Sequence, residues 1–448
     1  MKNIKQLIEK YNRPGPRYTS YPPVPYWNQT PPTEEQWIGH LLAKYKEEEG
    51  VDLYVHVPYC EKLCYYCGCN RTITRNHDLE DPYLDVVISE WNLYKTRLGF
   101  TPKINSLHFG GGTPTFLAPQ NLKKLILALT ENKRDNFIGS IEIDPRTCQV
   151  EHLKVLKELG ITRVSLGIQD FDPKVQAAIN RDQSVKMVEA LMDQLRHYKF
   201  QSINFDLIYG LPKQTMESIS STMEIVAKLK PDLIAFYGYA HLPGKIKNQR
   251  LINENDLPSA EERRNLYENG KIILQQYGYE DVGMDHFALP GSYLYEAKSS
   301  GNLHRNFMGY VEKKSSLLIG LGPTSISDSS MSFVQNAKEI KSYEDRIKEG
   351  KLAIETGHAH SPEDLVVQEL IIDLMCKGEV KIGNKNNLPH YQQIEKELLA
   401  FQDDGILQYK DDKIILSETG KGFVRNVAMI FDFHLREQSN KARFSQTI

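Results

Sequence analysis

Short apolar segments alternate with longer amphipathic segments from residue 51 onward. The short segments have the length and content of buried strands and comprise Leu53–His56, Ser106–Phe109, Ser140–Ile143, Val164–Ile168, Ile203–Leu207 and Leu233–Tyr237. The longer segments have helical spacing and comprise Tyr83–Leu98, Leu122–Glu131, Val150–Leu159, Val185–His197 and Met216–Leu229. Because alternating strands and helices build parallel sheets from right-handed βαβ units, the pattern predicts an α/β fold. Six such units without a dinucleotide-binding fingerprint favour a partial barrel over a doubly wound sheet.

The N-terminal residues differ from this pattern. Ile4–Tyr11 is a short amphipathic stretch. The proline-rich segment 12–23 that follows predicts an extended arm, because proline fixes φ and cannot continue a helix. Two readings stay open: a strap packed over the surface, or an arm that reaches the active site. In the second reading Arg13 and Arg17 bind carboxylates, since guanidinium groups match them in a bidentate fashion.

The C-terminal residues also change character. Ser361-Pro362 is a helix-start signal, and Tyr391–Asp403 is a second helical stretch. A hairpin is predicted to turn at Asp411-Asp412, and Thr419–Leu435 is predicted as one last helix. This order resembles a winged-helix-like unit, for which a structural lid is favoured over nucleic-acid binding.

Three domains are therefore predicted. Residues 1–50 form an N-terminal arm and helix, residues 51–335 form the barrel with extension strands, and residues 336–448 form a small, mostly helical domain. Within the middle domain, the glycine-punctuated apolar run 316–327 predicts a further strand and turn beside the barrel.

Polar groups follow every predicted strand. In chain order they are the cysteine-rich segment 60–70, Gly110–Pro114, Glu142 with Asp144, Gln169 with Asp170 and then Arg181, Asp206, and Tyr239–His241. The C-terminal ends of parallel strands meet at one edge of a sheet, where α/β proteins place their ligands. The sequence therefore predicts one cavity lined by these side chains.

Four of the six cysteines lie within ten positions, and Cys60, Cys64 and Cys67 make a C-x₃-C-x₂-C pattern. Thiolates on one tight loop suit an iron–sulfur cube, and three ligands leave one iron open to a non-protein ligand. Structural zinc sites take four protein ligands, often from paired cysteine clusters, and no second pair exists here. An iron–sulfur site is favoured over zinc or a metal-free loop. Cys69 lies too near Cys67 to share the cube easily, so we expect it to be a non-ligating neighbour.

Composition and charge exclude several classes. The 448 residues carry a formal net charge of −3, which gives no strong attraction to nucleic acid or lipid. There is no run of about 18 apolar residues and no apolar secretory segment, so we expect no membrane span and no secretion. Clustered cysteines then indicate metal ligands in a reducing compartment, and we expect a cytoplasmic protein.

The cysteine spacing resembles that of the radical S-adenosylmethionine (SAM) superfamily, which prefers an aromatic residue such as Tyr66 before the third cysteine. The resemblance implies an open (β/α)₆ TIM-like barrel. It also implies a [4Fe–4S] cluster on Cys60, Cys64 and Cys67 whose open iron chelates SAM and generates a 5′-deoxyadenosyl radical.

Longer segments resemble one family within it, the oxygen-independent coproporphyrinogen III oxidases. They are Arg13–Pro22, Tyr54–Pro58, Cys67–Asn70, Gly167–Phe171, Asp206–Pro212, Tyr239–Pro243, Gly283–Ala288 and His304–Phe307. The resemblance spans nearly the whole chain. It implies that two propionate side chains of coproporphyrinogen III are oxidatively decarboxylated to vinyl groups, giving protoporphyrinogen IX.

The resemblance also implies a set of SAM-contacting positions and a second SAM beside the first. The positions are Tyr54, Tyr66, Gly111, Gly112, Thr113, Glu142, Gln169, Arg181, Asp206, Ala240 and Ile326. The chain departs from the family at Met308, where we expect glutamine, and a thioether is a much weaker hydrogen-bonding group than an amide.

We expect an enzyme that uses an external electron donor and acts as a monomer, with arginines of the arm and of residues 240–310 holding the propionates. The alternative is a heme-binding or heme-delivery protein that keeps the cluster without the oxidase reaction. The Cys69-Asn70 ending and the complete arm favour the oxidase.

Overall fold

The computed structural model describes residues 4–27, 30–383, 385, 388–437 and 444–447. Its centre is a curved sheet, 12-stranded in the described residues, with the order β16-β15-β14-β13-β1-β4-β5-β6-β7-β8-β10-β9. The neighbours from β13 to β8 run parallel: β13 (Leu318–Leu321), β1 (Val51–Val57), β4 (Ile104–Gly111), β5 (Lys133–Ile143), β6 (Ile161–Gln169), β7 (Ser202–Tyr209) and β8 (Leu233–Gly238). The six strands expected from the sequence are all present. The sheet is open at both ends, which confirms the partial barrel.

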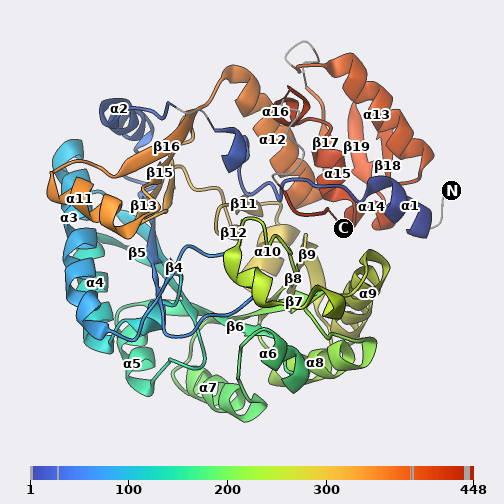
Figure 1. Ribbon diagram of the computed structural model, residues 1–448. Coiled ribbons are helices and arrows are strands. Elements are labelled where there is room, and N and C mark those ends of the chain that lie inside the picture. The colour runs from blue at the N-terminus through green and yellow to red at the C-terminus, as the bar shows by residue number, and fades with distance from the viewer. Residues whose placement is uncertain (1–3, 28–29, 384, 386–387, 438–443, 448) are drawn as a thin grey trace.

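Helices cover the convex face of this sheet (Figure 1). They are α3 (Glu80–Leu98), α4 (Pro119–Leu129), α5 (Val150–Glu158), α6 (Pro173–Ala178), α7 (Val185–His197), α8 (Met216–Leu229) and α9 (Ala260–Gln276). In α4 the buried residues Leu122, Leu125, Ile126 and Leu129 have the spacing of one helical face. The helices predicted from apolar spacing are thus confirmed, because their apolar faces lie against the strands.

Antiparallel strands extend the sheet at both edges. One edge carries β14 (Ile326–Asp328), β15 (Ser332–Asn336) and β16 (Ile354–Ala359), and the other carries β10 (His286–Ala288) and β9 (Glu280–Gly283). The strand and turn predicted from the run 316–327 are β13 and the start of β14. The sheet continues across residue 336, and the three-domain division stays a prediction.

Glu90 of α3 joins this extension to the first helix of the barrel. Its buried carboxylate accepts hydrogen bonds from the Gly322 backbone N–H at 2.8 Å, the Asn336 amide at 2.6 Å and the Tyr343 hydroxyl at 2.6 Å. Tyr343 belongs to α11 (Ile340–Lys348), which packs on α3. One carboxylate therefore holds three separate segments together beside the sheet.

The N-terminal arm packs on the C-terminal elements rather than lying free. The predicted N-terminal helix is α1 (Ile4–Tyr11), and the Tyr11 ring stacks on Phe401 with 4.6 Å between centroids. The C-terminal elements are α12 (Pro362–Lys377), β17 (Glu379–Lys381), α13 (Tyr391–Asp403), β18 (Leu407–Lys410) and β19 (Lys413–Leu416), with the sheet order β17-β19-β18. Two helices followed by a hairpin were expected here and are present. The first and last parts of the chain share one apolar core.

The single helix predicted at Thr419–Leu435 is wrong. The structure has three short helices instead, α14 (Glu418–Lys421), α15 (Val424–Ala428) and α16 (Phe433–Glu437). Asp432 is buried, and its carboxylate accepts bonds from the Tyr18 hydroxyl of the arm and from the Leu435 N–H. A new helix therefore begins after Asp432. The apolar spacing predicted which side chains are buried, and three short helices bury these side chains as well as one continuous helix would.

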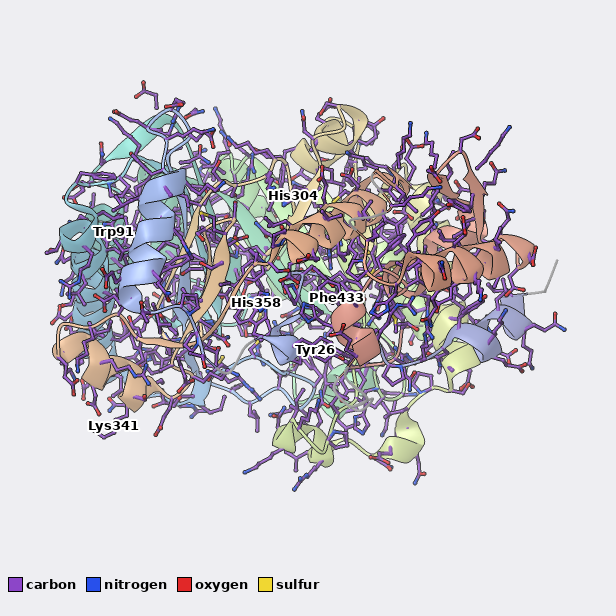
Figure 2. The ribbon with its side chains drawn as sticks, turned by 90° about the horizontal axis from the view of Figure 1, so that it is seen from above. Tyr26, Trp91, His304, Lys341, His358 and Phe433 are labelled. Atoms are coloured by element: carbon purple, nitrogen blue, oxygen red, sulfur yellow. The ribbon has the colours of Figure 1, made fainter. Side chains whose placement is uncertain are left out.

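Seen from above, Phe433 of α16 lies near the middle of the molecule and Trp91 of α3 near one end (Figure 2).

Among the described residues no helix has both the length and the apolar character needed to cross a bilayer.

Burial raises the pKa of the Glu90 carboxyl to about 7, against its three hydrogen bonds, whereas the unfolded chain releases this proton near 4.5. The folded state therefore holds the proton more tightly, and stability is lost as the pH rises from about 4.5 through about 7. Between pH 5 and pH 8, we expect the free energy of unfolding of the wild type to fall by about 2–3 kcal/mol more than that of Glu90→Gln. Urea unfolding at both pH values measures this. The exposed Glu158→Gln is the matched control, and equal slopes in all three proteins would contradict the assignment.

Candidate active site

The cysteine-rich loop begins at the C-terminal end of β1. It starts in the short strand β2 (Tyr59–Cys60) and returns through β3 (Thr72–Ile73), which pairs with β2. Between them, the Asn248 side-chain amide donates to the backbone carbonyls of Cys64, Tyr65 and Cys67 at 3.2, 2.8 and 3.0 Å. The loop conformation is therefore fixed from outside the loop.

Two further amides complete this support. The Gln249 side chain donates to the carbonyls of Tyr66, at 2.9 Å, and Ala240, at 3.0 Å. The Asn180 side chain donates to the Leu63 carbonyl at 2.6 Å. Gln249 thus joins two of the sequence-predicted positions, Tyr66 and Ala240, through their backbones. Sequence reasoning missed these amides, because nothing in the pattern marks an asparagine or glutamine far along the chain as a loop support.

Polar groups surround the thiols. The Thr113 hydroxyl donates to Cys60 Sγ at 3.2 Å, and the guanidinium groups of Arg146 and Arg181 lie 3.5 and 3.6 Å from Cys64 Sγ. Burial raises the pKa of the Cys60 thiol to about 11. The hydrogen bond from Cys69 outweighs burial at Cys67 and lowers the pKa of that thiol to about 6. Cys69 therefore lies beside Cys67, and its non-ligating role stays a prediction.

The two arginines share one carboxylate. Arg146 binds Asp144 through its Nη2, 2.6 Å from Oδ2, and Arg181 Nη2 lies 3.4 Å from Oδ1. Burial disfavours the charged form of Asp144, but Arg181 and Arg146 outweigh it and hold its pKa at about 2. Two nitrogens, Arg146 Nη1 and Arg181 Nε, are buried without a hydrogen-bond partner in the described structure. Two cations beside Cys64 with spare donors suit an anionic group at the loop.

The glycine-rich segment after β4 runs directly beside the loop. The Gly112 and Thr113 N–H groups donate to the carbonyls of Val57, at 2.7 Å, and Tyr59, at 2.9 Å. A Cβ at Gly112 would lie 2.8 Å from the Tyr59 carbonyl oxygen and 3.1 Å from Cys60 Sγ. Gly111 has a φ of 111°, which side chains rarely adopt. Its N–H donates to Glu142 Oε2 at 3.2 Å. Glycine is required here because the backbone passes against the thiol.

Glu142 and Asp206 line a cavity of about 300 Å³ inside the barrel, together with Tyr237, His286 and Met308. The Ser165 hydroxyl and the Asn204 amide donate to the Asp206 carboxylate at 2.7 and 2.9 Å. Burial raises the pKa of Asp206 to about 6. The cavity therefore offers carboxylate acceptors, and Glu142 links it to the glycine-rich segment through the bond from the Gly111 N–H.

Three more of the sequence-predicted positions, Gln169, Tyr54 and Ile326, lie on β6, β1 and β14, outside the lining of this cavity. Gln169 ends β6 with a φ of 69°, and the Gly167 backbone before it lies against the side chains of both Gln169 and Arg181. The Tyr54 hydroxyl bonds the His56 Nδ1 at 3.2 Å. Ile326 lies in β14, where its carbonyl faces Gly320, the β13 partner of Tyr54. Ile326 is therefore on the β13 side, apart from the cysteine loop.

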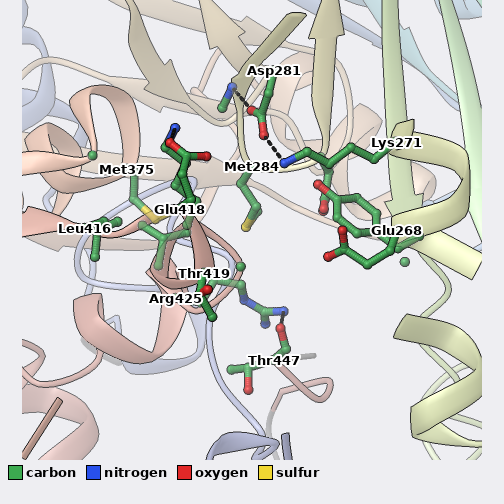
Figure 3. A pocket seen from close by; sticks show the side chains of 18 of the residues that line it. Glu268, Lys271, Asp281, Met284, Met375, Leu416, Glu418, Thr419, Arg425 and Thr447 are labelled. Atoms are coloured by element: carbon green, nitrogen blue, oxygen red, sulfur yellow. Dashed lines mark hydrogen bonds and ion pairs between the residues drawn. The ribbon is translucent and has the colours of Figure 1, made fainter. Parts of the chain in front are cut away.

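A larger cavity of about 660 Å³ lies between the barrel and the C-terminal elements (Figure 3). Its lining includes Tyr209 and Gly238, at the ends of β7 and β8, and four arginines: Arg17, Arg263, Arg264 and Arg425. Arg17 of the arm donates to the Gly238 carbonyl at 2.9 Å and lies 3.5 Å from Asp285. In the described structure the Nε atoms of Arg263 and Arg264 are buried without partners. The cavity therefore suits a ligand with several carboxylates.

Comparison with known proteins gives a consistent assignment. The Radical SAM superfamily matches residues 54–226. The oxygen-independent coproporphyrinogen III oxidase of Escherichia coli (strain K12) is 37% identical over 450 residues, covering 99% of this chain and 98% of that protein. The protein of the same name from Pseudomonas aeruginosa is 37% identical over 452 residues, with the same coverage.

A solved structure matches over almost the whole chain. It is the coproporphyrinogen III oxidase of Escherichia coli, described as a radical SAM enzyme, with a TM-score of 0.89 and 34% identity over 97% of this chain and 100% of that chain. The similarity includes the arm and the C-terminal elements as well as the barrel. The chain therefore belongs to the oxygen-independent coproporphyrinogen III oxidases, a family of the radical SAM superfamily.

Proposed function

We propose that this chain oxidatively decarboxylates two propionate side chains of coproporphyrinogen III to vinyl groups, giving protoporphyrinogen IX. The observation that carries the proposal is the full-length similarity to proteins named for this activity. Because the similarity includes the arm and the C-terminal elements, it supports the whole activity rather than radical chemistry alone.

Membership of the superfamily implies a [4Fe–4S] cluster and SAM. We assign the cluster to Cys60, Cys64 and Cys67. The spare donors of Arg146 and Arg181 fit an anionic group at this loop. When bound, the cluster and SAM supply a 5′-deoxyadenosyl radical, which removes hydrogen from the propionate β-carbon before CO₂ and one electron are lost.

The residues around the loop bind and orient SAM. Arg181 pairs with its carboxylate, Asp206 accepts bonds from its ribose hydroxyls, and the Gly111–Thr113 backbone with Glu142 receives its amino group. Tyr54, Tyr66, Gln169, Ala240 and Ile326 complete the proposed contact set. The Asn204 and Ser165 bonds already made to Asp206 hold its carboxylate in place for this role.

The substrate carries four propionates, and the arginines of the large cavity bind them. Arg17 reaches from the arm to Gly238, the last residue of β8, and Ala240 follows two residues later in the chain. Arg305 lies outside the lining of that cavity, but its Nη2 donates to the Arg17 carbonyl at 3.4 Å, and its Nε and Nη1 are buried without partners in the described residues. The other arm arginine, Arg13, is exposed and is not part of the cavity lining.

A second SAM beside the first, in contact with Met308, is also part of the proposal. Met308 lines the barrel cavity with Glu142 and Asp206, where the family resemblance implies a glutamine. The second molecule then binds with one polar contact fewer. The cytoplasmic location, the monomeric state, the electron donor and the domain boundaries at residues 50 and 335 remain predictions.

Reconstituted protein, incubated anaerobically with SAM, a reductant and coproporphyrinogen III, should form protoporphyrinogen IX together with 5′-deoxyadenosine. Cys60→Ala should contain less iron and form neither product, because one cluster ligand is missing. Cys148→Ala is the matched control: it lies outside the loop and should retain iron and activity. Neither product from iron-loaded wild type would contradict the proposal, and tight heme binding in that case would favour the heme-delivery alternative.

Arg17→Ala should lower kcat/KM for coproporphyrinogen III by about 10- to 100-fold, since a charge-assisted hydrogen bond contributes about 1.5–3 kcal/mol. Steady-state kinetics under anaerobic conditions measure this. Arg13→Ala, on the same arm, should behave as the wild type. If Arg17→Ala leaves both kcat and KM unchanged, the arm does not bind the propionates.

Met308→Gln should bind the second SAM about 3- to 10-fold more tightly, the effect of about one added hydrogen bond. Equilibrium dialysis of labelled SAM against cluster-loaded protein should give two molecules per chain for both proteins. Met187→Gln, on the exposed side of α7, is the control. A stoichiometry of one in every protein would show that no second site exists.

A further inference from the structure

Three metal-ligating side chains from distant parts of the chain meet at the edge of the large sheet, away from the cysteine loop. His358 lies in the edge strand β16, Asp364 in the first turn of α12, and His434 in α16. His358 and Asp364 are 3% and 2% exposed. Figure 2 shows His358 close to Phe433, the residue before His434. The cluster is therefore enclosed where the C-terminal elements meet the sheet.

Both imidazoles are directed at one carboxylate. His358 Nε2 lies 2.8 Å from Asp364 Oδ2, and His434 Nε2 lies 2.7 Å from Oδ1. The ligand atoms of the three residues all lie within 4.8 Å of one another. In the part of the chain that the structure describes, this is the one group of three or more such side chains that meets this distance.

The surroundings of Asp364 leave its charge without a lysine or arginine. In the described residues its ion pairs are those with the two histidines, and its Oδ2 also accepts the Ser361 N–H at 3.0 Å. A buried carboxylate is normally paired with a cation or coordinates a metal. A divalent cation bound by the three side chains would supply the positive charge that no lysine or arginine provides here.

Unused nitrogens next to the cluster give a second, independent observation. His358 Nδ1 is buried without a hydrogen-bond partner in the described structure, and so are both ring nitrogens of His360. The His360 ring lies 5.6 Å from that of His358, between centroids. If the three residues formed only a structural hydrogen-bond network, these unpartnered ring nitrogens would have no explanation, because buried polar atoms normally have partners. Either ring nitrogen of His360 could bind an ion, because neither is engaged in a hydrogen bond in the described structure.

We propose that His358, Asp364 and His434 bind a divalent transition-metal ion of the zinc class, with His360 as a further ligand. Two imidazole nitrogens and one carboxylate oxygen form a known ligand set for zinc and for iron(II). The site is distinct from the cysteine loop, and the proposal does not depend on the reaction that the protein catalyses.

The location indicates what the ion does. It joins α12 and α16 to the edge of the sheet, and the Tyr21 ring of the arm lies 5.8 Å from the His434 ring. Gln368 of α12 donates to the Tyr21 carbonyl at 3.1 Å. The ion therefore stabilises the surface on which the arm lies, and the same arm carries Arg17 to the large cavity.

Zinc chloride is the probe, and the protein is the full chain loaded with its cluster, so that the three loop cysteines are already occupied. Equilibrium dialysis with elemental analysis of zinc and iron should give one zinc per chain without loss of iron. The thermal unfolding midpoint of the wild type should rise with zinc. His434→Gln should bind zinc at least about tenfold more weakly, because even a change outside the ligand set costs 10- to 100-fold.

Glutamine is chosen because its amide N–H can still donate to Asp364, which preserves the folded contact while weakening the ligand. His197→Gln, exposed on α7, is the control and should bind zinc as the wild type does. The proposal is overturned if the wild type retains no zinc beyond buffer level, a result that needs no variant. It is also overturned if folded, iron-loaded His434→Gln binds zinc as tightly as the control.

Discussion

The loop that carries Cys60, Cys64 and Cys67 has no regular structure between β2 and β3, so its carbonyl groups need partners from elsewhere. Asn248 provides three of these bonds, and Gln249 and Asn180 provide others. Three thiols can hold a cluster only if the loop keeps them at fixed separations. The amide supports therefore determine how the three thiols are spaced.

The charged side chains next to the cysteine loop are also held in place by contacts from outside the loop. Arg146 and Arg181 are kept buried by their shared contact with Asp144, yet each keeps at least one donor unused. Buried cations with spare donors are stable only if a partner arrives, because an unpaired buried donor is costly. The spare donors are therefore available to an anionic group at this loop. The large cavity repeats this arrangement with Arg263 and Arg264, whose Nε atoms are also buried without partners in the described residues.

The two ends of the chain depend on each other. Leu7 and Tyr11 belong to the same apolar core as Leu374 and Phe401, and the Arg425 guanidinium donates to the Gly15 and Pro16 carbonyls of the arm. The arm therefore has a defined path that ends with Arg17 at the barrel mouth. The proline-rich segment, which cannot form a helix of its own, packs on elements that lie about 350 to 410 residues later in the chain.

The sequence by itself determined the barrel strands, the helices between them, the position of the cysteine-rich loop and the edge at which polar residues gather. These follow from local periodicity, from the parallel βαβ rule and from the spacing of three cysteines. It also predicted the arm and the hairpin at Asp411-Asp412, whose positive φ values suit such a turn. Only the tertiary structure decided which amides support the loop, why Thr419–Leu435 breaks into three helices, and that His358, Asp364 and His434 meet. Each of these depends on contacts between residues that are far apart in the chain. The local pattern of apolar and polar residues does not show which distant side chains will meet at a buried polar group.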